Sequence, residues 1–264
     1  MSIAEEIHVT YVGGPTALLE AGGWRMITDP TLDPADTDYV TPYYTLHKHQ
    51  SPRVAPGALG PLDLVLLSHD HHFDNLDHAG RKLIEKVGRV YTTTAAAGRL
   101  GSVAVGLEPW QSVSLPAREG RVLEITGTPC RHGPEGGDRG PVTGFLLQYR
   151  GESSGGVYVT GDTVWYEGVA RVAERFSVGL VLAFMGAARV PEVGPDALTM
   201  TASQGVTLAR AFGEAVIMPL HYEGWNHFTD SRSRVTDAFR EAGMLSRLRW
   251  PDMPREMKAG KHNR

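Results

Sequence analysis

The feature that most constrains this chain is a cluster of metal-ligand side chains that begins where an apolar segment ends. Residues 62–67 (LDLVLL) form a short run rich in Leu and Val, which predicts a buried strand. The next ten residues (SHDHHFDNLD) contain three of the chain's eleven histidines and three aspartates. Imidazoles and carboxylates at the end of a rigid strand are typical of a transition-metal site. The sequence therefore predicts a metal site in this segment.

Composition limits the classes of partner that the chain can have. The chain has 264 residues, 41% of them hydrophobic and 21% charged, with a net charge of −4, so it lacks the basic excess of a nucleic-acid-binding protein. No apolar run approaches the ~20 residues of a membrane span. The single cysteine, Cys130, excludes an internal disulfide, and the acidic N-terminus lacks a signal-peptide pattern. We expect a cytoplasmic protein that acts on a small molecule, with an oligomeric state that the sequence leaves open.

The first part of the chain has strong turn signals. Strands are predicted over residues 6–11, 16–20 and 24–28, because Gly-Gly-Pro and Gly-Gly separate them as in an antiparallel meander. Residues 29–61 have little periodicity and are predicted to be a long loop. Residues 75–87 carry apolar side chains at helical spacing, with Asn75 as the expected N-cap.

A second series of strands and helices follows. Strands are predicted over residues 89–93, 113–115, 122–126, 144–149, 156–160, 178–184 and 215–220. Helices are predicted over residues 163–176, 201–212 and 233–242, and the second of these opens with a capping-box sequence, TASQ. Two meanders, each followed by helices, predict an α/β fold: a four-layer αβ/βα sandwich of two mixed sheets with helices outside. We expect one domain over residues 1–253 and a flexible basic tail over 254–264.

Further metal-ligand side chains stand at the ends of other predicted strands. They are Asp29, His132, Asp162 and His221. Each has an ordinary structural interpretation when taken alone: Asp162 as a helix N-cap, His221 as a core histidine, His132 as a loop residue. The repetition of strand end, ligand and turn in both halves of the chain favours a shared metal site, since a sandwich brings the strand ends of its two sheets to one edge.

These segments together resemble the metallo-β-lactamase superfamily. The branch that they resemble contains L-ascorbate-6-phosphate lactonase and N-acyl phosphatidylethanolamine phospholipase D. The resemblance covers roughly residues 6–225, and its motifs are residues 13–16 (GGPT), 28–30 (TDP), 68–77, 128–133 (TPCRHG), 160–163 (TGDT) and 219–222 (PLHY). It implies the sandwich fold and a metal-dependent hydrolase.

The resemblance also implies a ligand set. Two histidines of the first motif and His132 would hold one metal ion. Asp74, His221 and the family's last histidine of the first motif, whose position is occupied by Asn75 here, would hold a second ion. Asp162 would bridge the two ions. A metal-activated hydroxide would attack the substrate. The expected cofactor is one or two divalent ions, zinc first, with Mn, Fe or Ni as alternatives.

The first motif departs from the family pattern at two places. It is one residue too long: His69 matches the first family histidine, whereas either His71 or His72 matches the second, and the downstream alignment favours His72. Asn75 stands where the family has a histidine, and an amide oxygen is a poor zinc ligand. The second metal position is therefore expected to be weaker, or to hold a harder ion. Gly14 also replaces an early family histidine.

The predicted activity is hydrolysis of a small ester, lactone or phosphoester. Asp74 is a candidate general base if it does not bind a metal ion firmly. His227 is a candidate to contact substrate or protonate the leaving group, with an exposed loop histidine as the alternative. Arg131 and Arg139 flank His132 and are candidates to meet an anionic substrate. No substrate-binding residue is assigned, although Tyr43, Tyr44, His47 and His49 lie in the long early loop. The alternatives are a phosphodiesterase and a non-catalytic metal-binding protein of this fold.

Overall fold

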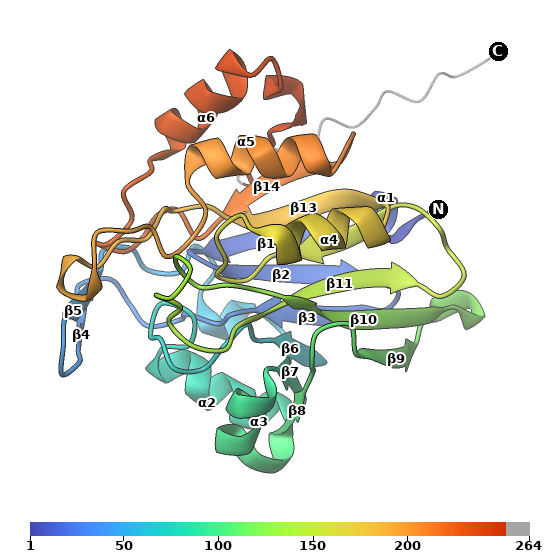
Figure 1. Cartoon of the computed structure of the whole chain (residues 1–264). Coiled ribbons are helices and arrows are strands. Elements are labelled where there is room, and N and C mark those ends of the chain that lie inside the picture. The colour runs from blue at the N-terminus through green and yellow to red at the C-terminus, as the bar shows by residue number, and fades with distance from the viewer. Residues whose placement is uncertain (252–264) are drawn as a thin grey trace.

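The computed structural model describes residues 1–251 and has two six-stranded sheets packed face to face, with helices on both outer sides (Figure 1). The predicted four-layer α/β sandwich is confirmed. The predicted tail, residues 254–264, lies outside the described residues, and the division into a single domain stays a prediction. No helix in residues 1–251 combines the length and apolarity needed to cross a membrane.

The first sheet is built by the N-terminal part of the chain. Its strand order is β1 (His8–Gly13), β2 (Thr16–Ala21), β3 (Trp24–Thr28), β6 (Leu64–Leu66), β7 (Val90–Thr92) and β8 (Ala104–Gly106). The meander β1–β2–β3 is antiparallel as predicted, whereas β3, β6, β7 and β8 pair in parallel. Helices α2 (His78–Val87) and α3 (Thr94–Leu100) follow β6 and β7 and lie outside this sheet (Figure 1).

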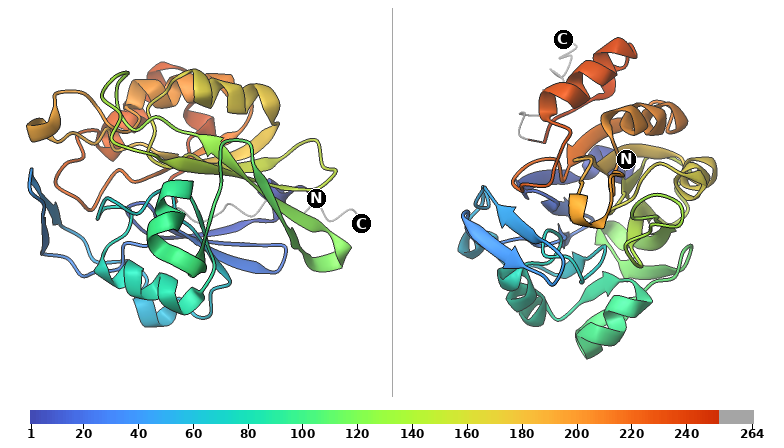
Figure 2. Two further views of the ribbon diagram at one scale, coloured as in Figure 1. Left: turned by 60° about the horizontal axis from the view of Figure 1, so that its bottom comes forward. Right: turned by 60° about the vertical axis from the view of Figure 1, so that its left-hand side comes forward.

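The second sheet is built by the C-terminal part of the chain. Its strand order is β14 (Val216–Leu220), β13 (Val178–Phe184), β12 (Gly156–Val159), β11 (Thr143–Tyr149), β10 (Val122–Pro129) and β9 (Ser112–Pro116). Strands β9 to β12 are antiparallel, and β12, β13 and β14 are parallel. Helices α4 (Glu167–Arg175), α5 (Ala202–Ala211) and α6 (Arg232–Glu241) cover its outer side (Figure 2).

Strand β13 shows why the chain forms layers. Its side chains alternate between the two faces of the sheet. Leu180, Leu182 and Phe184 belong to the core between the sheets, whereas Val181 and Ala183 belong to the core under the helices. Both faces are covered, so the strand is apolar throughout.

The prediction of a long loop over residues 29–61 is wrong in part. It contains a β-hairpin of β4 (Thr37–Val40) and β5 (Thr45–Lys48), followed by a short 3-10 turn, Pro56–Ala58. The hairpin is held from outside: His47 and its neighbour His49 hydrogen-bond through their backbones to residues 224–226, and the Tyr39 ring lies 5.2 Å from the Trp225 ring. These partners are too distant in sequence to leave a local signal.

The predicted start of the helix that follows the first motif is also wrong. Helix α2 begins at His78, and Asp77, not Asn75, is its N-cap, accepting a hydrogen bond of 2.8 Å from the Gly80 amide. Asn75 is instead fully buried beside Ser68. The capping box at Thr201 is confirmed. Helix α1 (Ile3–Glu6), α3 and β8 were not predicted from the sequence.

Candidate metal centre

Four strand ends bring the candidate ligands together. His69 follows β6, His132 follows β10, Asp162 follows β12 and His221 follows β14. All four side chains are buried, with exposed fractions of 3% or less. The His221 backbone has φ of 54°, a conformation that non-glycine residues rarely adopt, and its amide donates to the Gly14 carbonyl at 2.8 Å. The turn after β14 is therefore held against the turn after β1.

One group of side chains, which we call the first donor group, consists of His69, His72 and His132 with Asp162. His72 Nδ1 lies 2.9 Å from His69 Nε2 and 3.1 Å from His132 Nε2. His132 Nε2 lies 3.7 Å from Asp162 Oδ2. His132 Nδ1 donates to the Leu198 carbonyl at 2.9 Å, which leaves Nε2 free to bind an ion.

Two imidazoles of the first donor group, those of His69 and His72, are neutral at pH 7. Burial, together with the neighbouring His72 and His132, lowers the pKa of His69 well below its usual range. Burial and the nearby His132 lower the pKa of His72 to about 3. A neutral imidazole is the form that binds a metal ion, so no proton has to be displaced from these rings.

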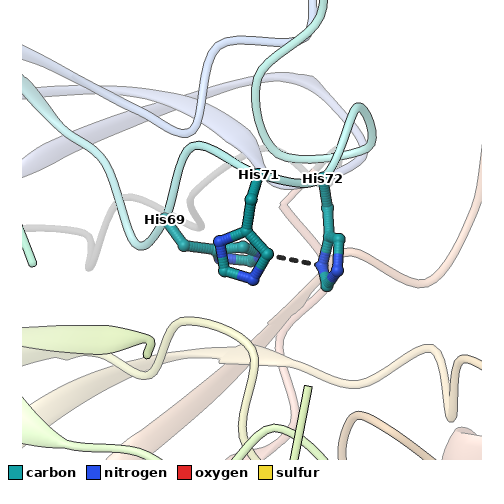
Figure 3. Close-up of side chains that lie close together, drawn as sticks. All are labelled: His69, His71 and His72. Atoms are coloured by element: carbon teal, nitrogen blue, oxygen red, sulfur yellow. Dashed lines mark hydrogen bonds between the residues drawn. The ribbon is translucent and has the colours of Figure 1, made fainter. Parts of the chain in front are cut away.

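His71 and His72 have different surroundings. The ligand atoms of His69, His71 and His72 all lie within 4.8 Å of one another. However, His71 Nε2 donates to the Arg139 carbonyl at 2.9 Å, whereas His72 contacts the two other histidines of the first donor group. Figure 3 shows the contact between His69 and His72. His72 therefore lies among the imidazole nitrogens of the first donor group, whereas His71 is hydrogen-bonded to a backbone carbonyl.

The second donor group consists of Asp74, Asp162 and His221. His221 Nε2 lies 3.3 Å from Asp74 Oδ2 and 3.4 Å from Asp162 Oδ1. Asp162 thus directs one oxygen to each donor group, as a bridging carboxylate does. Asp162 Oδ1 and both nitrogens of His221 are buried without a hydrogen bond. Buried polar atoms are rarely left unpaired, so these atoms fit a bound cation.

The second donor group is ionised. Burial favours the neutral form of Asp74, but His227 and His221 outweigh it and hold the pKa of this carboxyl well below its usual range. Burial also opposes the charge of His221, yet Asp162 and Asp74 raise the pKa of this imidazole to about 10.

A hydrogen-bond relay behind His69 was not assigned from the sequence. Asp29 Oδ1 accepts from the Ser68 amide at 2.8 Å and from Ser68 Oγ at 2.7 Å. Ser68 Oγ lies 2.9 Å from His69 Nδ1. Because the hydroxyl gives its proton to Asp29, it accepts from His69 Nδ1–H, and this fixes the tautomer with Nε2 free. The position of Asp29 at a strand end was the only sequence signal for this role.

Two further residues of the sequence predictions, His227 and Asn75, are buried close to the donor groups. The exposed-loop alternative for His227 is wrong, since the residue is 8% exposed and its Nε2 lies 2.9 Å from Asp74 Oδ2. Asn75 directs its amide nitrogen to Ser68 Oγ at 3.5 Å, and its Oδ1 is buried without a hydrogen bond.

An apolar pocket opens beside both donor groups. Its empty volume is about 380 Å³, including the open solvent at its mouth. Its polar lining comprises His72, Asp74, His132 and His227 together with Tyr44 and Arg139, and its apolar lining comprises Leu46, Ala188, Val190, Val193 and Leu198. Of the early-loop candidates, Tyr44 lines this pocket, whereas Tyr43, His47 and His49 do not, and Arg131 does not line it either.

Comparisons with known proteins identify the family. Residues 25–222 match the beta-lactamase superfamily domain, and the chain belongs to this superfamily. The UPF0173 protein YddR of Bacillus subtilis (strain 168) is 21% identical over 93% of this chain and 97% of its own length. A UPF0173 metal-dependent hydrolase of Salinibacter ruber is 23% identical over 92% of this chain and 96% of its own. The isothiocyanate hydrolase from Delia radicum gut bacteria superposes with a TM-score of 0.76 at 21% identity, over 95% of each chain.

The Salinibacter ruber relative is named as a metal-dependent hydrolase, and the two donor groups of this chain could hold metal ions. The superfamily implied by the motifs is confirmed. The individual roles of the site residues stay predictions.

Proposed function

We propose that this chain hydrolyses a small ester or lactone with an apolar body, at a site that holds one or two divalent ions, zinc in the first position. The observation that carries the proposal is the junction of two donor groups, sharing Asp162, with a pocket walled by apolar side chains. Pockets of this kind bind small molecules through apolar contacts and a few fixed polar groups.

The residues present fit the expected ions. His69, His72 and His132 offer three imidazole nitrogens, the ligand set of a catalytic zinc site. Asp74, Asp162 and His221 offer two carboxylates and one imidazole, a harder set. A bound divalent ion lowers the pKa of a coordinated water to about 7 and polarises a carbonyl.

The side chains of the chain supply the remaining chemistry. Asp74 Oδ2 is the acceptor that we propose to orient and deprotonate the attacking water. His227, whose Nε2 lies 2.9 Å from Asp74 Oδ2 and which lines the pocket, is the group that we propose to receive this proton from Asp74 and to deliver a proton to the leaving oxygen. The apolar wall excludes bulk water and holds the substrate body beside these groups.

The two metal positions are proposed to differ in affinity. Asn75 supplies no imidazole, so the second donor group has one nitrogen ligand where the first has three. We expect the first equivalent of zinc to bind tightly and the second equivalent, or a Mn²⁺ ion, to bind weakly.

The test combines metal content with turnover. The purified protein is loaded with zinc, its metal content is measured, and it is assayed on aryl esters, lactones and phosphodiesters. We expect turnover of the esters or lactones and loss of both metal and turnover in His132→Ala. The matched control is His8→Ala, because His8 is exposed on β1. Full metal content without turnover of any substrate supports the non-catalytic alternative, and turnover of phosphodiesters alone supports a phosphodiesterase.

A further inference from the structure

Among the residues that the structure describes, Arg139 is the one permanent cation that lines the apolar pocket. Its Nη2 donates to the Val193 carbonyl, which holds the side chain against the pocket wall. Its Nε is buried and makes no hydrogen bond. Among residues 1–251, no carboxylate is found within ion-pair distance of this guanidinium, whereas Arg131 on the same loop lies 3.8 Å from Glu135. A positioned guanidinium without an acidic partner is suited to bind an anion.

The extra residue of the first motif supports the loop that carries Arg139. His71 Nε2 donates to the Arg139 carbonyl, and the Arg139 amide donates to the His132 carbonyl at 2.9 Å. The neighbouring Gly140 leaves room for this contact, because a Cβ there would lie 2.9 Å from His71 Nε2. The Arg139 carbonyl is thus held by His71 and its amide by His132 of the first donor group, so the position of Arg139 relative to that group is fixed.

The charges around Arg139 favour a ligand that has a single negative charge and lies in the apolar pocket. A neighbouring cavity of about 620 Å³ shares Arg139, Val193 and Leu198 with the apolar pocket. That cavity is also lined by Glu135 and Asp196, which oppose an anion farther out. One guanidinium matches one carboxylate, whereas a phosphate dianion would carry a second charge into an apolar pocket beside Asp74.

We propose that Arg139 selects substrates that carry a carboxylate in addition to the bond that is cleaved, and that His71 is the positioning residue for Arg139. The substrate is then a small ester or lactone with an apolar body between its reacting carbonyl and a carboxylate. This proposal rests on the proposed function for the reaction itself and adds the charge of the substrate.

The test uses two aryl esters of equal chain length. The 4-nitrophenyl ester of pentanoate ends in a methyl group, and the mono-4-nitrophenyl ester of glutarate ends in a carboxylate. We expect the wild-type protein to prefer the glutarate ester. In Arg139→Met we expect KM for the glutarate ester to rise by about 10- to 100-fold, the range of a charge-assisted hydrogen bond, with little change for the pentanoate ester.

Companion variants separate recognition from folding. Arg139→Lys keeps the charge and is expected to lose less than Arg139→Met. His71→Ala is expected to raise KM for the glutarate ester while it keeps its zinc, which a purely structural defect at the metal centre would not do. Arg131→Met is the control, since its side chain stacks on Tyr166, outside the pocket. Equal effects of Arg139→Met on both esters, or none on either, would overturn the proposal, and so would a preference for a phosphate-ended ester.

A binding experiment tests the role of Arg139 independently of the hydrolysis reaction. If the wild-type protein cleaves neither ester, the proposed function fails for esters, and calorimetric titration with pentanoate and pentanamide still tests Arg139. We expect zinc-loaded wild-type protein to prefer pentanoate and Arg139→Met to lose most of that preference. A preference that persists in Arg139→Met would show that the ion alone holds the carboxylate and would overturn the proposal.

Discussion

At the scale of single residues, the first motif divides its histidines between two tasks. His69 and His72 face His132, and His71 faces the backbone of Arg139. With one additional residue in the motif, His71 faces the loop that carries Arg139, and His72 faces the metal centre. The choice between His71 and His72 depends on a carbonyl 68 residues away in sequence.

The first prediction concerns these two histidines. His72→Ala removes a proposed ligand, whereas His71→Ala removes a hydrogen bond to a loop. We expect zinc affinity to fall by about 100-fold or more in His72→Ala, since second-shell changes alone cost about 10- to 100-fold. We expect His71→Ala to keep at least a tenth of the wild-type affinity. Competition with a chromophoric chelator measures both, and the reverse order of losses would make His71 the ligand.

The second prediction concerns Asn75. In Asn75→His an imidazole replaces an amide whose oxygen has no hydrogen bond. We expect the second equivalent of zinc to bind at least tenfold more tightly, about 1.4 kcal/mol. Isothermal titration with zinc measures the two steps separately. Asn75→Asp is the companion variant, since it adds a carboxylate without the larger ring, and an unchanged second step in both variants would place residue 75 outside the metal centre.

At the scale of elements, a buried ion pair joins the β4–β5 hairpin to the start of helix α2. Lys48 Nζ lies 3.0 Å from Asp77 Oδ2 and donates to the Thr31 carbonyl at 3.0 Å. Asp77 also accepts from the amides of Asp33 and Gly80. Burial lowers the pKa of Lys48, although Asp77 opposes this shift. The pair fixes the hairpin that carries Tyr44 and Leu46 into the apolar pocket.

The third prediction follows from this pair. Asp77→Ala leaves Lys48 buried without its carboxylate and removes the N-cap of α2, so we expect the free energy of unfolding to fall by about 3–5 kcal/mol. Lys48→Met is expected to cost less, because Asp77 keeps its two amide donors and the methionine fills the same space. Urea unfolding of both variants measures this, and an Asp77→Ala loss below about 1 kcal/mol would contradict the role of the pair.

A second ionic contact joins helix α1 to both sheets. Glu6 accepts from the Gly22 amide at 2.8 Å, the Tyr149 hydroxyl at 2.9 Å and Arg121 at 2.9 Å. Burial raises the pKa of Glu6, but these hydrogen bonds outweigh burial and leave it below the ordinary value of 4.5. The folded protein therefore binds this proton less readily than the unfolded chain does.

The fourth prediction is the pH dependence that results. Because the folded pKa is depressed, the stabilising effect of Glu6 is present above the unfolded pKa and is lost as pH falls through the folded pKa. We expect wild type to be more stable than Glu6→Gln at pH 7 and the difference to shrink as pH falls below 4.5. Thermal unfolding at several pH values measures it. A difference that stays constant from pH 7 to pH 3 would assign the effect to shape rather than charge.

At the scale of the whole molecule, the sequence predicted the sheets better than the pocket. Runs such as residues 178–184 are apolar throughout because both faces of β13 are covered. Such runs can be recognised in the amino-acid sequence alone. The β4–β5 hairpin was missed because it is stabilised by contacts to residues 224–226. Ala188, Val190 and Leu198 are ordinary apolar residues in sequence, and only the fold brings them beside His132. Ligands at strand ends carried a periodic signal, whereas pocket walls carried none.

The contribution of both sheets to each donor group has a consequence for folding kinetics. His69, His72 and Asp74 come from the half of the fold built on the first sheet, and His132, Asp162 and His221 come from the half built on the second sheet. Neither half alone presents a complete ligand set, so an ion binds firmly only after the halves have docked. Interactions that form after the transition state slow unfolding and leave the folding rate unchanged. Zinc is therefore expected to lengthen the unfolding relaxation time in stopped-flow experiments, with refolding at the same rate with and without the ion.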